Sequence, residues 1–421
     1  MTSIYLPMKY LLESNPAFII LEVDNDEYVF YNSLQHVGAR LTRLELSLLD
    51  LVYTYQDTEY LVSKFPENQR KTIHNAILGI ENHNLLNCEG IKYTKKETNS
   101  FPTEYYIHLT YRCNLQCQYC YNKSIRRNYQ QDMTTEEWIQ IIDKVLPYAK
   151  RIIFTGGECF LHNGFARIAT YIKSQKPSVV LSAISNGTLD YKAIAEPNIF
   201  NYLSELSLSC DSLDSEGKRV GFKPEIFKNN IEWVKRHYPH IALTLASVYT
   251  CENSKEIEKT ERYCLENHMS FDKTILIPES AEEIELMPSI NEIYENNKFI
   301  HKNSEIRRLD SPRIRCGAGK TTCSIDPMGN VFPCQSLHYD ELSMGNLLTT
   351  AIESLNYNSK MLTVDDIPVC SKCNVKYICG GGCFATGYSF YKHKQDRNHL
   401  TCHLNRHNAI EILKSLNNRL K

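Results

Sequence analysis

Three cysteines, Cys113, Cys117 and Cys120, follow one another in a C-x3-C-x2-C pattern. An aromatic residue, Tyr119, directly precedes the last of them. Three thiolates cannot all pair as disulfides, and tetrahedral zinc and ordinary [4Fe–4S] sites each need four ligands. The stretch therefore favours an iron–sulfur cluster with one open iron, where a cofactor could bind and be cleaved.

A second group of eight cysteines begins at residue 316. Its members are Cys316, Cys323, Cys334, Cys370, Cys373, Cys379, Cys383 and Cys402. The spacing CxxC-x5-C-x3-C is formed by Cys370, Cys373, Cys379 and Cys383. Secondary-structure patterns are sparse after residue 310, so bound metal would supply much of the folding free energy of this region. A zinc-binding interaction module is an alternative, but the two CxxC pairs of a zinc ribbon are absent.

Apart from its cysteines, the chain has the composition of an ordinary globular protein. It has 421 residues, of which 16 are cysteine, 42% are hydrophobic and 23% are charged. The net charge of −2 gives no support for nucleic acid as a partner. We find no signal-peptide pattern and no apolar run of about 18 residues, and therefore expect a cytoplasmic protein without a membrane partner. In that reducing compartment, this many cysteines indicate metal rather than disulfides.

The three-cysteine loop directly follows the first of six expected strands. Strand and helix patterns alternate from residue 104 to about 280, with strands at 105–110, 151–155, 179–185, 205–211, 241–248 and 273–277. A helix over 135–146 opens with the capping box Thr134 and Glu137. Alternating units predict an α/β fold with a parallel sheet. Six of them predict a partial (β/α)6 TIM-like barrel with its site at the carboxyl ends of the strands.

Glycine, polar, charged and proline residues of possible functional interest lie at or after the ends of most of the later strands. They are Gly156, Gly157 and Glu158 after the second strand, Ser185 and Asn186 after the third, Ser209 on the fourth with Arg219 beyond it, and Pro278 after the sixth. Glycine lets a backbone approach a ligand closely. A carboxylate binds an ammonium group, and a guanidinium binds a carboxylate.

The cysteine spacing, Tyr119 and these strand-end residues together resemble the radical SAM (S-adenosylmethionine) superfamily. The resemblance implies that the open iron chelates SAM, that Glu158 holds its ammonium group and that Ser185 and Asn186 contact its ribose or carboxylate. It implies further that Ser209 belongs to a Ser-x-Asp motif, that Arg219 clamps the SAM carboxylate and that adenine packs near Pro278. The chain departs from the family in having Cys159 where proline usually follows Gly-Gly-Glu, and in a two-residue displacement of Arg219.

The late cysteines resemble the SPASM extension of radical SAM enzymes, which binds two auxiliary [4Fe–4S] clusters. By this resemblance the first auxiliary cluster is held by Cys316, Cys323, Cys334 and Cys383, and the second by Cys370, Cys373, Cys379 and Cys402. With the radical SAM cluster this makes three clusters in all. The loop around Cys323 varies in the family, so its role depends on the fold.

Residues 1–95 show two or three strands, among them 17–23 and 27–31, and then helical spacing. This order resembles the winged-helix-like α+β domain that binds leader peptides in peptide-modifying systems; a cap on the barrel is the alternative. The expected domains are therefore 1–95 for leader recognition, 100–305 for the partial barrel and 306–421 for an irregular, cysteine-rich SPASM domain.

These resemblances imply an enzyme that cleaves SAM to a 5′-deoxyadenosyl radical and abstracts hydrogen from a ribosomal precursor peptide. The electron donor would be a flavodoxin or ferredoxin. Because eight cysteines could ligate both auxiliary clusters fully, we predict a carbon–carbon or carbon–oxygen crosslink. The alternatives are a thioether-forming maturase and an anaerobic sulfatase-maturing enzyme, which carries aspartate where this chain has Gln335. The sequence assigns no catalytic acid or base, and His338 is expected in a solvated loop.

Overall fold

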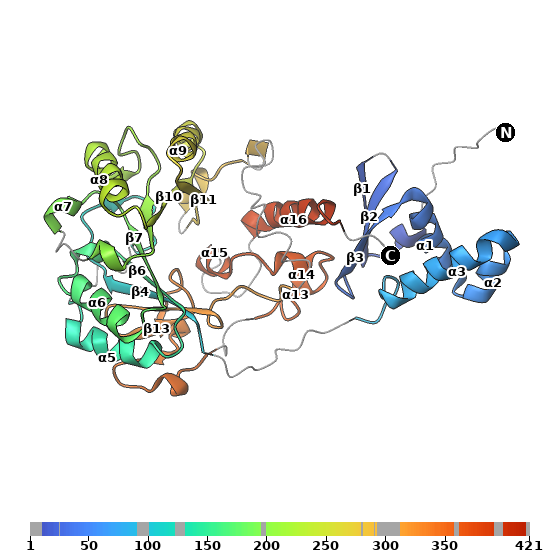
Figure 1. Cartoon of the computed structure of the whole chain (residues 1–421), viewed down its shortest axis with the longest axis horizontal. Coiled ribbons are helices and arrows are strands. Elements are labelled where there is room, and N and C mark those ends of the chain that lie inside the picture. The colour runs from blue at the N-terminus through green and yellow to red at the C-terminus, as the bar shows by residue number, and fades with distance from the viewer. Residues whose placement is uncertain are drawn as a thin grey trace.

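A computed structural model shows three regions, with the C-terminal helices between the main sheet and the N-terminal sheet (Figure 1). The structure describes residues 11–24, 26–90, 101–122, 131–194, 199–278, 281–289, 291–292, 312–357, 362–390 and 399–417. Within these ranges, no helix is both long enough and apolar enough to cross a membrane.

The N-terminal region is a three-stranded antiparallel sheet followed by three helices. Its elements are η1 (Leu11–Ser14), β1 (Phe18–Asp24), β2 (Glu27–Asn32), β3 (Val37–Thr42), α1 (Arg43–Tyr55), α2 (Thr58–Ser63) and α3 (Glu67–Asn82). Thr42 and Glu45 form a capping box at the start of α1. One face of the sheet, with Phe18 and Phe30, packs on α1–α3. The strands and helices predicted for 1–95 are thus present, and the winged-helix description stays a prediction.

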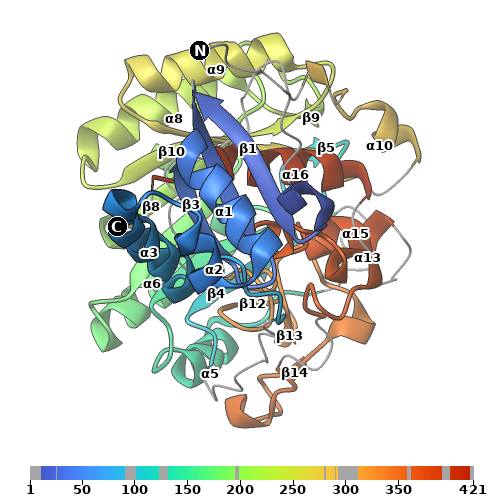
Figure 2. The same ribbon diagram turned by 90° about the vertical axis from the view of Figure 1, so that its right-hand side faces the viewer.

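The other face of this sheet packs against the C-terminal region. Ile19, Val29 and Tyr31 form one buried cluster with Ile378 of α14 (Lys376–Cys379) and Ile412 of α16 (His399–Lys414). Figure 2, in which the N-terminal region lies in front of α16, shows the same neighbourhood from the side. The N-terminal sheet is therefore covered on both faces, and within the described residues no further strand pairs with the outer edges of β1 and β3.

Six parallel strands form the main sheet in the order β11-β10-β8-β7-β6-β4. They are β4 (Glu104–Thr110), β6 (Arg151–Gly156), β7 (Val180–Ser185), β8 (Glu205–Ser209), β10 (Ala242–Tyr249) and β11 (Ser270–Ile275). The helices between them include α5 (Thr135–Val145), α6 (Phe165–Gln175), α8 (Pro224–His237) and α9 (Ser254–Glu266). The predicted alternation is present, and partial closure into a barrel stays a prediction.

Two predicted strands differ from the structure by two residues or more, the other four by one residue at one or both ends. β8 ends at Ser209, two residues early, because the Asp211 carboxylate accepts hydrogen bonds from Arg219 and from the backbone of Val248. β11 begins at Ser270, earlier than the predicted 273, in a segment with little hydrophobic signal.

The two faces of β4 have different environments. Tyr105, Ile107 and Leu109 belong to the main hydrophobic core with Trp138 and Ile141 of α5. Because side chains alternate along a strand, Glu104, Tyr106 and His108 lie on the opposite, inner face.

The C-terminal region extends the main sheet. β12 (Thr322–Ile325) pairs in parallel with β4 and leads to β13 (Asn330–Phe332) and β14 (Gly345–Asn346), so the sheet has nine strands and is mixed. The helices of this region are α13 (Pro368–Ser371), α14, α15 (Phe384–Phe390) and α16. Sequence patterns did not predict β12, since a four-residue strand carries little periodic signal.

Candidate metal and cofactor site

The three-cysteine loop leaves the carboxyl end of β4 and is fixed by a short antiparallel pair. β5 (Gln116–Cys117) pairs with β9 (Arg219–Val220), which places Arg219 opposite Cys117. The Arg219 guanidinium lies 5.7 Å from the centre of the Tyr119 ring. Arg219 thus reaches the cysteine loop despite its displacement in the sequence, because the β5–β9 pairing sets its place.

The thiols of this loop influence one another. Burial raises the pKa of the Cys117 thiol to about 11; Arg219 lowers it, and Cys120 and Cys113 raise it further. Three neighbouring thiols would all have to ionise to bind iron, and the Arg219 guanidinium favours the ionised form of Cys117.

Arg219 is held by Asp211 on the inner side of the loop. Its Nε donates to one carboxylate oxygen at 3.0 Å and its second nitrogen to the other at 3.3 Å. Burial lowers the pKa of Arg219, but the charge and hydrogen bonds of Asp211, together with the Cys117 and Cys210 thiols, raise it above its usual value, so the guanidinium stays charged. A buried, oriented cation beside an open iron suits a ligand carboxylate.

The Gly-Gly-Glu segment after β6 lies directly against the cysteine loop. A side chain at Gly157 would meet the carbonyl oxygen of Arg112 at 2.2 Å. The Glu158 amide donates to the same carbonyl at 2.8 Å. Glycine is thus needed here for close approach to the chain's own backbone, whereas the sequence suggested approach to a ligand.

Glu158 joins the ends of the second and third strands. The side chain is fully buried and accepts a hydrogen bond from the Asn186 amide at 2.8 Å. Burial raises the pKa of its carboxyl group to about 7, although hydrogen bonds from Asn186, Ser185 and Phe160 lower it. A carboxyl group poised near neutrality can hold an ammonium group, whose charge favours ionisation.

The remaining predicted cofactor residues lie at the same edge of the sheet. The Asn186 amide group donates to Asn114 at 2.8 Å and lies 3.7 Å from the Cys113 sulfur. Ser185 accepts a hydrogen bond from Tyr191 at 2.9 Å. Ser209 ends β8, and Pro278 is buried beyond β11. The structure therefore joins Glu158, Asn186 and Arg219 to the loop and sets Ser209 and Pro278 along the same edge.

Six of the eight late cysteines separate into two sets. Burial raises the pKa of Cys334 to about 12, and the thiols of Cys383 and Cys316 raise it too. The pKa of Cys379 is raised by burial and by Cys373, and also by Cys402. Cys379 and Cys383 are separated by three glycines, Gly380, Gly381 and Gly382, whose φ angles of 70°, 81° and 75° are left-handed. Because this turn reverses the backbone, Cys379 and Cys383 can lie in different sets although they are close in the sequence.

Cys323 belongs to neither set, and its place disagrees with its predicted role as a ligand. It lies in β12, opposite Tyr105 of β4, and is 1% exposed within the hydrophobic core. Burial alone raises its pKa, while Cys334 responds to two other thiols. Strand alternation turns Cys323 to the core face and its neighbour Ser324 to the inner face, so we remove Cys323 from the proposed ligands.

Within the described ranges, no three His, Cys, Asp or Glu side chains converge closely enough to hold a single ion. The loop Cys113, Cys117 and Cys120 and the two late sets offer thiolates, the ligands of iron–sulfur clusters. In their chemistry, these donors fit [4Fe–4S] clusters.

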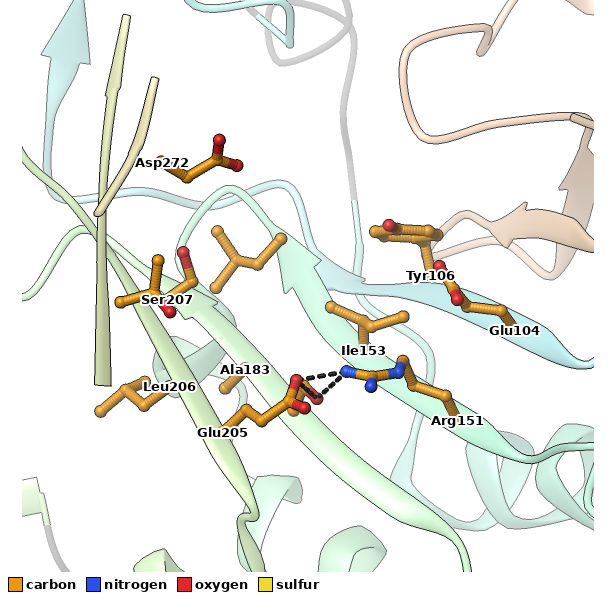
Figure 3. A pocket seen from close by; sticks show the side chains of 12 residues that line it. Glu104, Tyr106, Arg151, Ile153, Ala183, Glu205, Leu206, Ser207 and Asp272 are labelled. Carbon is orange, nitrogen blue, oxygen red and sulfur yellow. Dashed lines mark hydrogen bonds and ion pairs between the residues drawn. The ribbon is translucent and has the colours of Figure 1, made fainter. Parts of the chain in front are cut away.

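A pocket of about 380 Å³ lies on the inner side of the main sheet, at the amino-terminal half of its strands. Glu104, Tyr106 and Asp272 line it, with Arg151 and Glu205 paired across its floor (Figure 3). Burial raises the pKa of the Tyr106 phenol, the Glu104 carboxylate raises it further, and the nearby Cys334 thiol adds a smaller increase. One residue of the pocket therefore lies near a late cysteine, a neighbourhood that the sequence did not indicate.

Two family models match the chain. The model described as Radical SAM superfamily matches residues 107–264, and the one described as Iron-sulfur cluster-binding domain, SPASM, matches residues 316–374. The first match contains the three-cysteine loop and the strand-end residues through Arg219.

A curated relative is similar to most of the chain. The antilisterial bacteriocin subtilosin biosynthesis protein AlbA of Bacillus subtilis (strain 168) is 23% identical over 330 residues, covering 71% of this chain and 71% of AlbA. Two other curated relatives are covered less fully: the matched part of this chain spans 39% of the length of one and 40% of the length of the other.

Two solved structures share the fold. SuiB of Streptococcus suis, solved bound to precursor peptide SuiA, has a TM-score of 0.55 at 15% identity, covering 92% of this chain and 98% of that one. The structure of anSMEcpe with bound AdoMet and Kp18Cys peptide has a TM-score of 0.58 at 16% identity, covering 74% and 97%.

Proposed function

Since the chain carries a radical SAM domain followed by a SPASM iron–sulfur domain, we propose that it modifies a ribosomally made precursor peptide. The observation that carries this proposal is one combination: a three-thiol loop, a second thiol region, and an N-terminal sheet that packs on that region with its strand edges open. The AlbA name refers to bacteriocin biosynthesis, and SuiB was solved with a precursor peptide. Both support a peptide substrate.

In this proposal the chain holds SAM and three [4Fe–4S] clusters, and a flavodoxin or ferredoxin supplies the electron. Cys113, Cys117 and Cys120 hold the first cluster. When bound, these groups supply a 5′-deoxyadenosyl radical and accept the electron released on product formation. The chain's own residues orient SAM, with Glu158 at its ammonium group and Arg219 at its carboxylate, and the main sheet, partly closed as a barrel, excludes water.

We assign leader binding to the N-terminal region. A peptide strand can add to an open sheet edge through backbone hydrogen bonds. The backbone amide of Ser33 donates a hydrogen bond to the carbonyl oxygen of Ala17, and the backbone amide of Arg43 donates one to the carbonyl oxygen of Asp26. Hydrogen-bonded and non-hydrogen-bonded residue pairs alternate along antiparallel strands. In the observed register, the backbone amides of Ile20 in β1 and Arg40 in β3 therefore point away from β2.

Proline substitution tests each edge without removing the domain. Ile20→Pro and Arg40→Pro each delete one outward amide, while the matched Ile20→Ala and Arg40→Ala variants keep it. We expect one proline variant to lose precursor binding in fluorescence anisotropy and its alanine control to keep it. Unchanged binding in both proline variants would refute leader binding by strand addition.

The position of Cys323 changes the proposed bond. The carbon–carbon or carbon–oxygen prediction rested on eight ligands, but Cys323 packs in the core and leaves Cys316, Cys334 and Cys383 for the first auxiliary cluster. Three thiolates leave one iron open to a substrate thiolate, as in the thioether-forming alternative. We therefore favour a thioether, with the pocket beside Cys334 as the approach.

Mass spectrometry of the modified precursor after thiol alkylation tests this choice. A thioether shows a loss of two hydrogens with one cysteine protected from alkylation. A loss of two hydrogens with every cysteine alkylated would restore the carbon–carbon or carbon–oxygen crosslink. Formylglycine would favour the sulfatase-maturing alternative.

A further inference from the structure

One buried imidazole in the main sheet has no hydrogen-bond partner. His108, in β4, is 0% exposed, and among the described residues neither ring nitrogen is hydrogen bonded. Buried polar groups are nearly always hydrogen bonded, since leaving one unpaired lowers the stability of the folded protein. A site that retains such a group usually uses it for something other than stability.

The strand places His108 between the pocket and the cofactor edge. His108 shares the inner face of β4 with Glu104 and Tyr106, which line the pocket (Figure 3). It lies one step nearer the carboxyl end, opposite Thr155 of β6, and the cysteine loop begins a few residues later. A substrate side chain that extends from the pocket toward SAM would pass this imidazole.

The described neighbours of His108 pack against its ring but make no hydrogen bond to either of its nitrogens. The His338 ring lies 4.3 Å away, centre to centre, but its Nδ1 is bonded to the Tyr111 hydroxyl at 2.6 Å and its Nε2 to Ser324 at 2.8 Å. Phe332 stacks on His338 at 4.5 Å. His338, expected in a solvated loop, is instead a fixed wall whose nitrogens are both in use.

The charge state of the pair leaves a lone pair on His108. Burial, followed by the neighbouring His338, lowers the pKa of His108, and burial lowers the pKa of His338 to about 3. Both rings are therefore neutral at physiological pH, and one nitrogen of His108 can accept a hydrogen bond. Because the pKa of His108 is lowered, a proton that it accepts is held only transiently.

We propose that His108 contacts the substrate and accepts the proton released when the new bond forms. The proposal rests on the peptide-modifying function. A hydrogen atom leaves a C–H bond to form 5′-deoxyadenosine; the carbon radical then bonds the sulfur or other acceptor atom, whose proton passes to His108 and whose surplus electron passes to an auxiliary iron–sulfur cluster. Because His108 is fully buried, the proposal requires the Tyr121 ring, whose centre lies 6.3 Å from that of His108, to move when substrate enters.

The test separates hydrogen abstraction from bond formation. Iron-loaded, full-length wild type, His108→Asn and His108→Gln are given SAM, reductant and a carbon-deuterated form of a precursor peptide that wild type modifies. In the variants, deuterium should still enter 5′-deoxyadenosine, while crosslink per 5′-deoxyadenosine should fall by at least about 100-fold, the usual loss on removing a general base. Iron content should not change.

His162→Asn is the matched control. His162 is also buried, but both its nitrogens are bonded, to Met133 at 3.0 Å and Gly164 at 3.1 Å, so its replacement should leave that ratio unchanged. An unchanged ratio in the His108 variants, loss of deuterium transfer, or loss of iron in both would overturn the proposal. Failure of wild type to modify any precursor, with SAM cleavage intact, would instead refute the peptide function.

Discussion

The three-cysteine loop after β4 and the C-terminal cysteines hold their thiols by different means. The loop is short and is tied by the β5–β9 pair, by Gly157 and by Asn186 to three strand ends. The C-terminal thiols come from distant segments joined by turns, with hydrophobic support from the N-terminal sheet. Local spacing therefore defines the first ligand set, whereas only packing can define the others.

Removing the loop thiols should have the largest effect. The Cys113→Ala, Cys117→Ala, Cys120→Ala variant should lose about a third of its iron, one of three four-iron clusters, and all SAM cleavage. Iron analysis and 5′-deoxyadenosine quantitation measure both. Retained SAM cleavage would refute the assignment of this loop.

A pair of single variants tests the ligand set of the C-terminal region. Cys334→Ala should lose up to one cluster, about four irons of twelve. Cys323→Ala should keep all its iron and lose only about 1 kcal/mol of stability through a small cavity. Iron analysis with thermal unfolding distinguishes them. Equal iron loss in both would return Cys323 to the ligands and restore the argument for a fully ligated cluster.

The pH dependence of SAM binding tests Glu158. Burial raises the pKa of its carboxyl group to about 7, so protonation below that pH should compete with the SAM ammonium group. Affinity should fall as pH drops below 7, by up to about tenfold per unit, the limit for one proton. Calorimetric titration of wild type with SAM between about pH 6 and about pH 8.5, a range that brackets this pKa, should show the fall in affinity.

Glu158→Gln is the control, and it should bind SAM weakly at every pH. The stability of the SAM-free protein should depend on pH in the opposite direction. The pKa of Glu158 in the folded protein lies above its ordinary value of 4.5, so the contribution of Glu158 to folding stability is lost as pH rises from 4.5 to about 7. Affinity in wild type that does not change with pH would exclude Glu158 as the ammonium ligand.

The smallest effect is expected at the triple-glycine turn. Gly381 has a φ of 81°, and an added Cβ would lie 3.3 Å from Val364. Gly381→Ala should therefore destabilise the protein by about 1–3 kcal/mol through backbone strain, with iron content preserved. Thermal unfolding measures this. A loss of iron equal to that of Cys334→Ala would mean that the turn itself sets the ligand geometry.

Removing the N-terminal region would test leader binding poorly. Ile19, Val29 and Tyr31 cover Ile378 and Ile412, so truncation at residue 95 would expose this cluster beside Cys379. Lost activity could then reflect a damaged cluster region, which is why proline variants at the sheet edges are the sharper experiment.

The sequence alone determined the six α/β units, the cysteine loop and the strand-end residues. These are local patterns: apolar periodicity marks each strand, and a ligand loop of eight residues needs no distant partner. Even Arg219, displaced in sequence, followed from its place after the fourth strand.

Tertiary structure decided what each residue faces. β12 joins β4 in a register that turns Cys323 into the core and Ser324 toward His338, and a shift of one residue would exchange them. The same pairing converts His338 from an expected loop residue into the wall beside His108. Sequence cannot supply this register, because it depends on strands separated by more than two hundred residues and on the core that both bury.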